Sequence, residues 1–455
     1  ITGSITFVPP GMKQVLENSD HVIKWYSNLT SIARVTAKVN DEMIAEIDHV
    51  GDVMKGDDFD NATFYGHINI SALFIGITDM ELRFYDDRDV VVAKETLPVT
   101  VLLSYQKLND IFTLAIGIFV AIAYVNMGAT MDLGVVKKIL KTPIGPLLGV
   151  ICQFIFMPLI AFGLGKIVFP DNPMAQLGMF LSGCSPGGGI SNMWTHLLGG
   201  SLDLSIMMTF TSNVIAFGSV PLWVFMLGSV ILGDANFVIP YKDIAVLVIS
   251  LALPSIIGLI IQRFLPRLAK ILKMLLTPIT IFNIIFIFTF GVYANVYIFS
   301  YFTWQTLLVG FLSPALGYLS GLLLAKLCCQ PTKDIIAISI ETGIQNNTVA
   351  LFILKLTFVK PAGDLAAVFP SAAVLMTPIP LLTALAIKKI YECSVRSKSQ
   401  DITDVKAKVL EKGEGLNGTG MDRVKDSTTS NGKELQSASH NGMDNPAMDL
   451  EDESV

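Results

Sequence analysis

Two short segments of the chain's apolar region carry oxygen-bearing side chains among otherwise apolar residues. The first reads CSPGGGISN at 184–192, and the second reads ETGIQN at 341–346. Carboxylate, amide, hydroxyl and carbonyl oxygens are the ligands that hard cations prefer, and such a site needs neither cysteine nor clustered histidine. These residue types therefore indicate binding of a sodium ion in an apolar environment.

Further oxygen ligands are found in neighbouring apolar stretches. Ser205 and Thr209 are spaced i and i+4, which places both hydroxyls on one face of a helix. Hydroxyls at such positions also commonly bond to carbonyls of their own helix, so both interpretations stay open. Gln153 is another amide inside an apolar run, with the same two interpretations. The candidates in the two segments themselves are Ser191, Asn192, Glu341 and Gln345.

Both segments are expected to interrupt membrane helices. Pro186 lacks a backbone donor, and the glycines at 187–189 disfavour continued helix. Small residues there would also suit close packing between helices. Glu341 would cost about 2.5 to 3.5 kcal/mol at the centre of a spanning helix, so it is expected to be functional. A plain interhelical hydrogen-bond cluster explains Glu341 less well, because a lone carboxylate would still lack a cation.

The elements that must position these residues are transmembrane helices. The chain has 455 residues, of which 52% are hydrophobic and 15% charged, and its net charge of -6 argues against nucleic-acid binding. From about residue 109 to 390 the apolar residues form blocks long enough to cross a bilayer. We expect nine spans, near 109–131, 142–168, 174–198, 203–232, 243–264, 272–297, 305–327, 333–358 and 364–388.

The two interrupted spans are the third and the eighth. They lie five helices apart, and an odd repeat length inverts the second copy relative to the first. This arrangement is typical of inverted-repeat transporters, in which unwound segments meet near the midplane and present carbonyls to ions and substrate. The sequence therefore predicts an all-α polytopic transporter with two discontinuous crossing helices.

Residues 1–105 are expected to form a separate β-rich domain. Apolar and polar residues alternate there in short runs bounded by Asp, Asn and Gly, which indicates a small β-sandwich. Asn28, Asn61 and Asn69 are acceptors for N-glycosylation and suggest that this domain is extracellular. The chain starts at Ile1 without an apolar leader, so either a signal peptide has been removed or the sequence is a fragment.

Charged residues favour a topology with the N-terminus outside the cell. Scattered lysines are assigned to the outer loops, namely Lys166, Lys242, Lys355 and Lys360. Cytoplasmic loops carry an excess of Lys and Arg, which predicts a multi-pass protein of the plasma membrane with a cytoplasmic C-terminus. The inner loops and the start of the tail hold Lys137, Lys138, Lys141, Arg263, Arg267, Lys270, Lys273, Lys326, Lys333, Lys388, Lys389, Arg396 and Lys398.

The last segment, 393–455, is expected to be a disordered cytoplasmic tail that follows the membrane domain at 106–392. It is rich in Asp, Glu, Ser, Gly and Asn and has almost no aromatic residues, so it cannot bury enough apolar surface to fold. Its end, Glu453-Ser454-Val455, offers a carboxylate and a valine side chain to a PDZ domain. Many tails end this way without a partner.

The motifs CSPGGGISN, LSIMMT at 204–209 and ETGIQN, in this order, resemble the bile acid:sodium symporter family over residues 109–390. The resemblance implies a panel domain and a core domain, and it implies two sodium sites. The long N-terminal domain departs from the familiar bile acid carriers and is similar to orphan relatives. The implied ligands are Ser191, Asn192, Ser205, Thr209 and Glu341 for one sodium, and Gln153 and Gln345 with carbonyls near Glu341, Thr342 and Ile344 for the other.

The sequence thus predicts sodium-coupled symport of an amphipathic organic anion by alternating access, with Asn346 as a candidate substrate contact beside the crossing. One alternative is a receptor or scaffold that uses the N-terminal domain. Another is a cation/proton antiporter, in which Glu341 would release protons. An enzyme is not expected, because the aqueous regions contain no His/Cys cluster, activated nucleophile or phosphate loop, and His196 is solitary.

Overall fold

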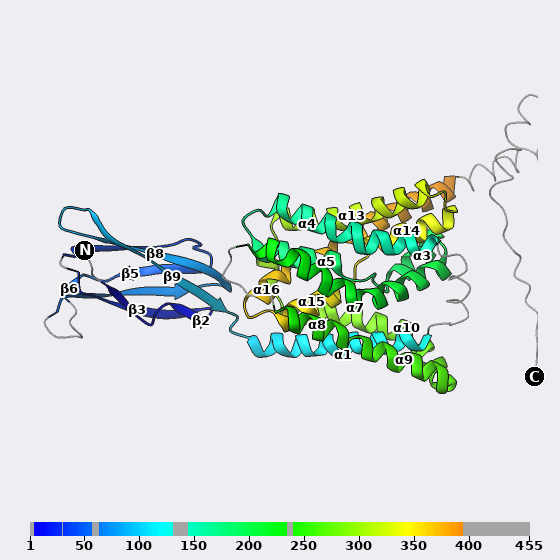
Figure 1. The fold of residues 1–455 in the computed structure, drawn as a ribbon, viewed down its shortest axis with the longest axis horizontal. Coiled ribbons are helices and arrows are strands. Elements are labelled where there is room, and N and C mark those ends of the chain that lie inside the picture. The colour runs from blue at the N-terminus through cyan, green and yellow to red at the C-terminus, as the bar shows by residue number, and fades with distance from the viewer. Residues whose placement is uncertain (1–3, 30, 57–62, 131–143, 234–239, 395–455) are drawn as a thin grey trace, which may run out of the picture. The chain divides into compact units, whose positions relative to one another are not determined.

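The computed structural model describes residues 4–29, 31–56, 63–130, 144–233 and 240–394. The chain up to Leu385 forms one compact unit, built from strands at its N-terminal end and from helices after them (Figure 1). The expected β-rich region is therefore present. Apart from its first two residues, the expected tail at 393–455 lies outside the described residues.

The N-terminal strands form two sheets. One sheet has the order β1-β3-β7-β5, with β6 also paired to β7, and the other has the order β2-β9-β8-β4. All pairings are antiparallel except that of β2 with β9. The strands are β1 Ile5–Val8, β2 Met12–Leu16, β3 Ser19–Ser27, β4 Arg34–Val39, β5 Ala45–Val50, β6 Met54–Lys55, β7 Phe64–Ala72, β8 Gly76–Tyr85 and β9 Val91–Leu102.

Alternation of side chains explains how the two sheets bury one core. In β7 and β8 every second residue is buried, as the two-residue period of a strand requires. Ile70 from one sheet and Leu82 from the other are both fully buried in this core. Trp25 and Phe84 also meet there, with ring centroids 5.1 Å apart in an edge-on arrangement. The sequence pattern thus correctly located the β-rich region.

The rest of the described chain is helical. Two short π-helices, η1 and η2, interrupt the α-helices. The elements are α1 Gln106–Thr130, α3 Ile144–Ile151, η1 Cys152–Phe156, α4 Met157–Val168, α5 Pro173–Cys184, α6 Ser191–Leu198, α7 Leu202–Leu232, α8 Tyr241–Ser250, α9 Ala252–Phe264, α10 Pro266–Phe286, η2 Ile287–Gly291, α11 Val292–Ala294, α12 Tyr297–Ser300, α13 Trp304–Leu327, α14 Thr332–Gly343, α15 Asn347–Thr357, α16 Ala362–Ala366 and α17 Val368–Met376.

Six helical stretches of the described chain are long and apolar enough to cross a membrane. Large apolar side chains such as Phe225 and Ile167 are more than two-thirds exposed on them, which suits contact with lipid. Of the nine expected spans, the third and eighth are instead split into α5–α6 and α14–α15, and the sixth corresponds to α10 and η2. The six are Gln106–Thr130, Ile144–Val168, Leu202–Leu232, Tyr241–Phe264, Trp304–Leu327 and Ala362–Ser394.

The helices pack into two groups. In one, α1, α9 and α10 contact each other, and in the other, α4, α5, α7, α13, α14 and α17 are linked by contacts. Within the first group, small residues allow the backbones of α1 and α9 to approach each other closely. A Cβ on Gly128 of α1 would lie 2.3 Å from the Ser255 carbonyl oxygen of α9, so the two helices touch through their backbones. The split helices α5–α6 and α14–α15 pack with the second group.

We predict that Leu82→Ala lowers the free energy of unfolding of the N-terminal domain by about 2 to 5 kcal/mol, because it leaves a cavity in a close-packed core. The measurement is urea-dependent proteolysis of this domain in the full-length, detergent-purified protein. Val22→Ala is the matched control, since Val22 lies in β3 with 51% of its surface exposed. An equal decrease in the free energy of unfolding in both variants would contradict the assignment of Leu82 to the core.

Candidate ion-binding site

The two broken helices leave their helical conformation at neighbouring points. After α5, the backbone at Ser185 is extended, and α6 begins only after the PGGG run. After α14, the backbone at Ile344 is likewise extended before α15 begins. Each break therefore exposes peptide groups that a continuous helix would have satisfied internally.

The unwound segments satisfy each other's backbone groups. Gly188 N donates to the Ile344 carbonyl at 2.9 Å, and Asn346 N donates to the Pro186 carbonyl at 2.8 Å. The two strands of chain run antiparallel at this point and form one isolated β-bridge. Because an unpaired peptide group is costly away from water, this pairing is what allows irregular backbone inside an apolar protein layer.

Glu341 lies beside this crossing and is 2% exposed. The Ser191 hydroxyl donates to its Oε2 at 2.6 Å, and the Thr209 hydroxyl donates to its Oε1 at 2.6 Å. The Ser205 hydroxyl donates to Oε2 at 3.2 Å. Four side chains from α6, α7 and α14 therefore place five oxygen atoms around one small region. The Thr209 hydroxyl also lies 3.0 Å from the Ser205 carbonyl of its own helix, so the structure contains both contacts that the sequence left open.

The carboxylate of Glu341 is hydrogen-bonded to hydroxyl groups and, among the described residues, pairs with no basic side chain. Within the described residues, no Lys, Arg or His forms an ion pair with it. A buried carboxylate is costly unless an opposite charge compensates it. The surrounding hydroxyl oxygens have lone pairs that can turn to a cation, so the arrangement is chemically suited to binding a hard cation between carboxylate and hydroxyls.

A second group of oxygen atoms lies around the side chains of Gln153 and Gln345. The Gln153 amide donates to the Ser185 carbonyl and to Gln345 Oε1, both at 2.6 Å. The Gln345 amide in turn donates to the Thr342 carbonyl at 2.7 Å. Gln153 is 2% exposed and Gln345 is 8% exposed. These two amides and the nearby carbonyls connect the first half of the helical region to both breaks.

Gln153 belongs to a π-helix that the sequence reasoning missed. Pro158 has no N–H to give to the carbonyl of Phe154 four residues earlier, and the Trp223 indole N–H donates to that carbonyl instead, at 2.8 Å. Single π-helical turns within α-helices occur frequently at functional sites. Pro158 was the available sequence signal, because a proline inside a spanning helix frees a carbonyl.

Other predicted ligands lie near the crossing without contacting Glu341. The Asn192 amide donates weakly to the Gly189 carbonyl at 3.4 Å, and its Oδ1 is a buried acceptor without a hydrogen-bond partner among the described residues. Thr342 Oγ1 donates to the Ile338 carbonyl at 2.7 Å, so only its carbonyl faces Gln345. Ile344 and Asn346 take part through the backbone pairing described above.

The predicted glycosylation acceptors have different environments. Asn28 is exposed, and its Oδ1 accepts from the Ser4 N–H at 2.7 Å. Asn69 lies inside β7, between β3 and β5, with a buried Oδ1. Asn61 lies outside the described residues. Glycosylation of these sites stays a prediction.

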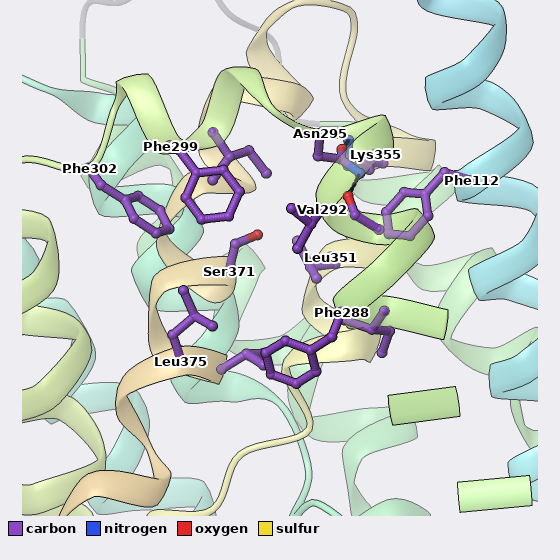
Figure 2. Close-up of a pocket in the computed structure, with 14 residues that line it drawn as sticks. Phe112, Phe288, Val292, Asn295, Phe299, Phe302, Leu351, Lys355, Ser371 and Leu375 are labelled. Atoms are coloured by element: carbon purple, nitrogen blue, oxygen red, sulfur yellow. Dashed lines mark hydrogen bonds between the residues drawn. The ribbon is translucent and has the colours of Figure 1, made fainter. Parts of the chain in front are cut away.

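A buried cation was misplaced by the sequence analysis. Lys355 was assigned to an outer loop, but it lies in α15 with its side chain 2% exposed. Its ammonium lies 2.9 Å from Asp364 Oδ1 and donates to Asn109 Oδ1 at 2.7 Å and Asn295 Oδ1 at 2.8 Å, the last of which is visible in Figure 2. The Tyr297 hydroxyl is a further contact, at 3.2 Å. The apolar run VALFILKLTF around Lys355 was the signal that this lysine is buried and needs a partner.

Comparisons with known proteins cover most of the helical region. A profile of the sodium bile acid symporter family matches residues 115–301. The ileal sodium/bile acid cotransporter of Mus musculus is 29% identical over 286 residues, which is 62% of this chain and 80% of that protein. The sodium-dependent organic anion transporter of Bos taurus is 30% identical over 270 residues, 58% of this chain and 70% of that protein. The P3 protein of Mus musculus is 30% identical over 266 residues, 58% of this chain and 56% of that protein.

We predict that sodium stabilises the purified protein and that Gly187→Ala weakens this stabilisation. A Cβ at this position would lie 2.4 Å from Glu341 Oε1, so the carboxylate must move. Losing hydrogen bonds to a charged group costs about 1.5 to 3 kcal/mol each, so sodium affinity should fall at least about tenfold. The measurement is the rise in melting temperature with sodium, which a ligand of the native state produces.

The matched control for this prediction is Gly189→Ala. Gly189 lies in the same unwound segment, but a Cβ there meets nothing within 4 Å. We expect sodium to raise the melting temperature of this variant by as much as that of the original protein. Equal sodium responses of the two variants would contradict the site.

For the buried ion pair, we predict that Lys355→Met destabilises the protein by about 3 to 5 kcal/mol, because Asp364 is left buried without its cation. The double variant Lys355→Met/Asp364→Leu should recover most of this loss. Lys360→Met is the control, because its ion pair with Asp110 is partly exposed and is expected to contribute about 0 to 1 kcal/mol. Denaturant unfolding in detergent tests the three variants, and a double variant as unstable as the single one would refute the pairing argument.

Proposed function

Because the chain belongs to the sodium bile acid symporter family, we propose that it carries an amphipathic organic anion across the membrane together with sodium ions. The protein is an integral membrane protein, and two of its relatives are named as a sodium/bile acid cotransporter and a sodium-dependent organic anion transporter. The observation that carries the proposal is the carboxylate of Glu341, buried at the helix crossing among three hydroxyl donors. The substrate class proposed is a bile acid or a steroid sulfate.

Two sodium ions are proposed as co-transported cargo. The first would occupy the space between Glu341 and the hydroxyls of Ser191, Ser205 and Thr209, with the unpaired Oδ1 of Asn192 as an added ligand. Its charge would compensate that of the carboxylate. The second would lie among the amide and carbonyl oxygens, with ligands from Gln153, Gln345, Glu341, Thr342 and Ile344.

Ion binding would control the substrate site through the unwound segments. The first proposed site takes ligands next to both breaks, from Ser191 after the first and Glu341 before the second, and the second site takes ligands within the second break, so filling both would hold the breaks in one conformation. The two helix groups would then act as a panel (α1, α9, α10) and a core (α4, α5, α7, α13, α14, α17) that move against each other to alternate access. Each net positive charge moved inward would add about 2.3 kcal/mol per 100 mV of membrane potential to the free energy that drives transport.

The direction of transport follows from the proposed topology. The N-terminal domain would be extracellular, as the acceptor asparagines suggest, and the basic loops cytoplasmic, in the plasma membrane. With this orientation the sodium gradient and the membrane potential both drive uptake into the cell. A role for the C-terminus as a ligand for a PDZ domain is a separate proposal that concerns residues outside the described part of the chain.

The test of this function is uptake of radiolabelled taurocholate and of a steroid sulfate into cells that express the chain, in sodium or in choline medium. We predict sodium-dependent uptake of at least one of them. Glu341→Gln should raise the sodium concentration for half-maximal uptake at least about tenfold, because a neutral amide attracts a cation less than a carboxylate does. Asp243→Asn, an exposed residue in the first turn of α8, is the control and should leave uptake unchanged.

Three outcomes would count against the proposal. Uptake that is equally fast in choline would exclude sodium coupling. A normal sodium dependence in Glu341→Gln, at equal surface expression, would exclude the proposed first ion site. Absence of uptake for a broad set of organic anions, with surface expression confirmed, would favour a receptor or scaffold.

A further inference from the structure

The indole of Trp223 in α7 makes a polar contact to which the proposed transport cycle assigns no role. Trp223 is half-buried against the apolar core of the helical region, and its N–H donates to the Phe154 carbonyl at 2.8 Å. Phe154 lies in η1, next to Gln153. The contact therefore joins α7 to the segment that carries a ligand of the second proposed sodium site.

The Phe154 carbonyl needs a donor from outside its own helix. In an α-helix its partner would be the N–H four residues later, but that residue is Pro158, which has no N–H. Phe154 is only 6% exposed, and a buried carbonyl without a partner is costly. The indole N–H of Trp223 supplies the hydrogen bond that Pro158 leaves unmade.

The π-helical turn sets the direction of the Gln153 side chain. The Met157 N–H donates to the Cys152 carbonyl five residues earlier, so the turn holds one residue more than an α-helical turn does. Removing this extra residue would rotate the helix before the turn by about 100° relative to the helix after it, which is the angle between successive residues of an α-helix. Because α4 packs against α5 and α13, the rotation would fall on the preceding segment. Gln153 would then turn away from the Ser185 carbonyl and from Gln345, its two partners in the structure.

A role in packing alone would need only the apolar body of the ring. A phenylalanine at position 223 supplies most of that body but has no N–H to donate. The hydrogen bond is therefore the feature that is specific to tryptophan. Pro158 and Trp223 act together in this arrangement, since the proline removes the donor that would favour an α-helical turn and the indole replaces it from another helix.

We propose that Trp223 is a positioning residue for the second sodium site. Its hydrogen bond to the Phe154 carbonyl holds the π-helical turn, and this turn directs the Gln153 amide to the helix crossing. The inference rests on the symport function proposed above and names the residue that positions one of its ion ligands. Because α7 also carries Ser205 and Thr209 of the first site, one helix supports both sodium sites.

The first test is equilibrium binding of ²²Na⁺ to the detergent-purified full-length protein, which should bind two sodium ions. Trp223→Phe should bind one of them with unchanged affinity and the other at least about tenfold more weakly, because residues that orient a metal ligand typically contribute about 10- to 100-fold to metal affinity. Trp304→Phe is the matched control and should keep both affinities, since Trp304 is 70% exposed at the start of α13. Two unchanged affinities in folded Trp223→Phe would overturn the proposal.

The double variant Trp223→Phe/Pro158→Ala separates positioning from general stability. The alanine at position 158 gives the Phe154 carbonyl an N–H partner within an α-helix, so the melting temperature lost in Trp223→Phe should be largely recovered. The second sodium ion should still bind weakly, because the turn is then α-helical and Gln153 points elsewhere. This variant also serves if Trp223→Phe does not fold. Recovery of the melting temperature together with both sodium affinities would show a structural role only and would overturn the proposal.

Failure of this inference is distinguishable from failure of the symport function, because the structure of the double variant in choline does not depend on sodium. Electron cryo-microscopy should show one continuous α-helix over residues 144–168, with Gln153 turned away from Gln345. A retained π-helical turn would overturn the role of Trp223 alone. An original protein that binds fewer than two sodium ions would instead contradict the second proposed site, and the structure of the double variant would still decide whether Trp223 holds the turn.

Discussion

The arrangement of the helical region depends on one constraint, which is that peptide groups in an apolar layer must be hydrogen-bonded. Two helices are broken, and each break is tolerated because the unwound segment of the other supplies the missing partners. The pairs Gly188–Ile344 and Asn346–Pro186 fix the two breaks against each other. This brings residues about 150 positions apart in sequence, such as Ser191 and Glu341, into hydrogen-bond contact. The glycines are required here, since any side chain at Gly187 would collide with the Glu341 carboxylate.

Two buried ionisable groups show how differently a charge can be accommodated in this protein. Lys355 is compensated by Asp364 and by three further oxygens, so its charge is balanced inside the chain. Glu341 has hydroxyl donors only among the described residues. The first arrangement is complete without a ligand, whereas the second becomes electrically neutral only when a cation or proton binds. This contrast is the physical reason to place ion coupling at Glu341 and to give Lys355 a different role.

Much of the site could be predicted from the sequence, because its residues break strong local rules. A proline followed by three glycines, and a carboxylate among apolar residues, are conspicuous in spanning segments, and both breaks were located correctly. The i, i+4 spacing of Ser205 and Thr209 also placed both hydroxyls correctly. Alternation of apolar and polar residues revealed the strands of the N-terminal domain, although not the order of its sheets, which depends on contacts between distant strands.

Other features depend on tertiary contacts, and the sequence signals for them were not recognised. Lys355 was wrongly assigned to a loop, since its partners Asn109, Asn295 and Asp364 lie far from one another in the sequence. The carbonyl of Phe154 that Pro158 leaves free, in the π-helix at Gln153, accepts from Trp223, which lies far along the chain.

The central claim is that Glu341 and the hydroxyls around it form a sodium site, and equilibrium binding of ²²Na⁺ to the purified protein tests it most directly. The account predicts saturable ²²Na⁺ binding that excess unlabelled sodium displaces and choline does not. It also predicts that replacing Thr209 by valine, which keeps the side-chain shape and removes one of the ligand oxygens, weakens this binding. Absence of saturable ²²Na⁺ binding in a folded preparation, or full binding in the Thr209→Val variant, would contradict it.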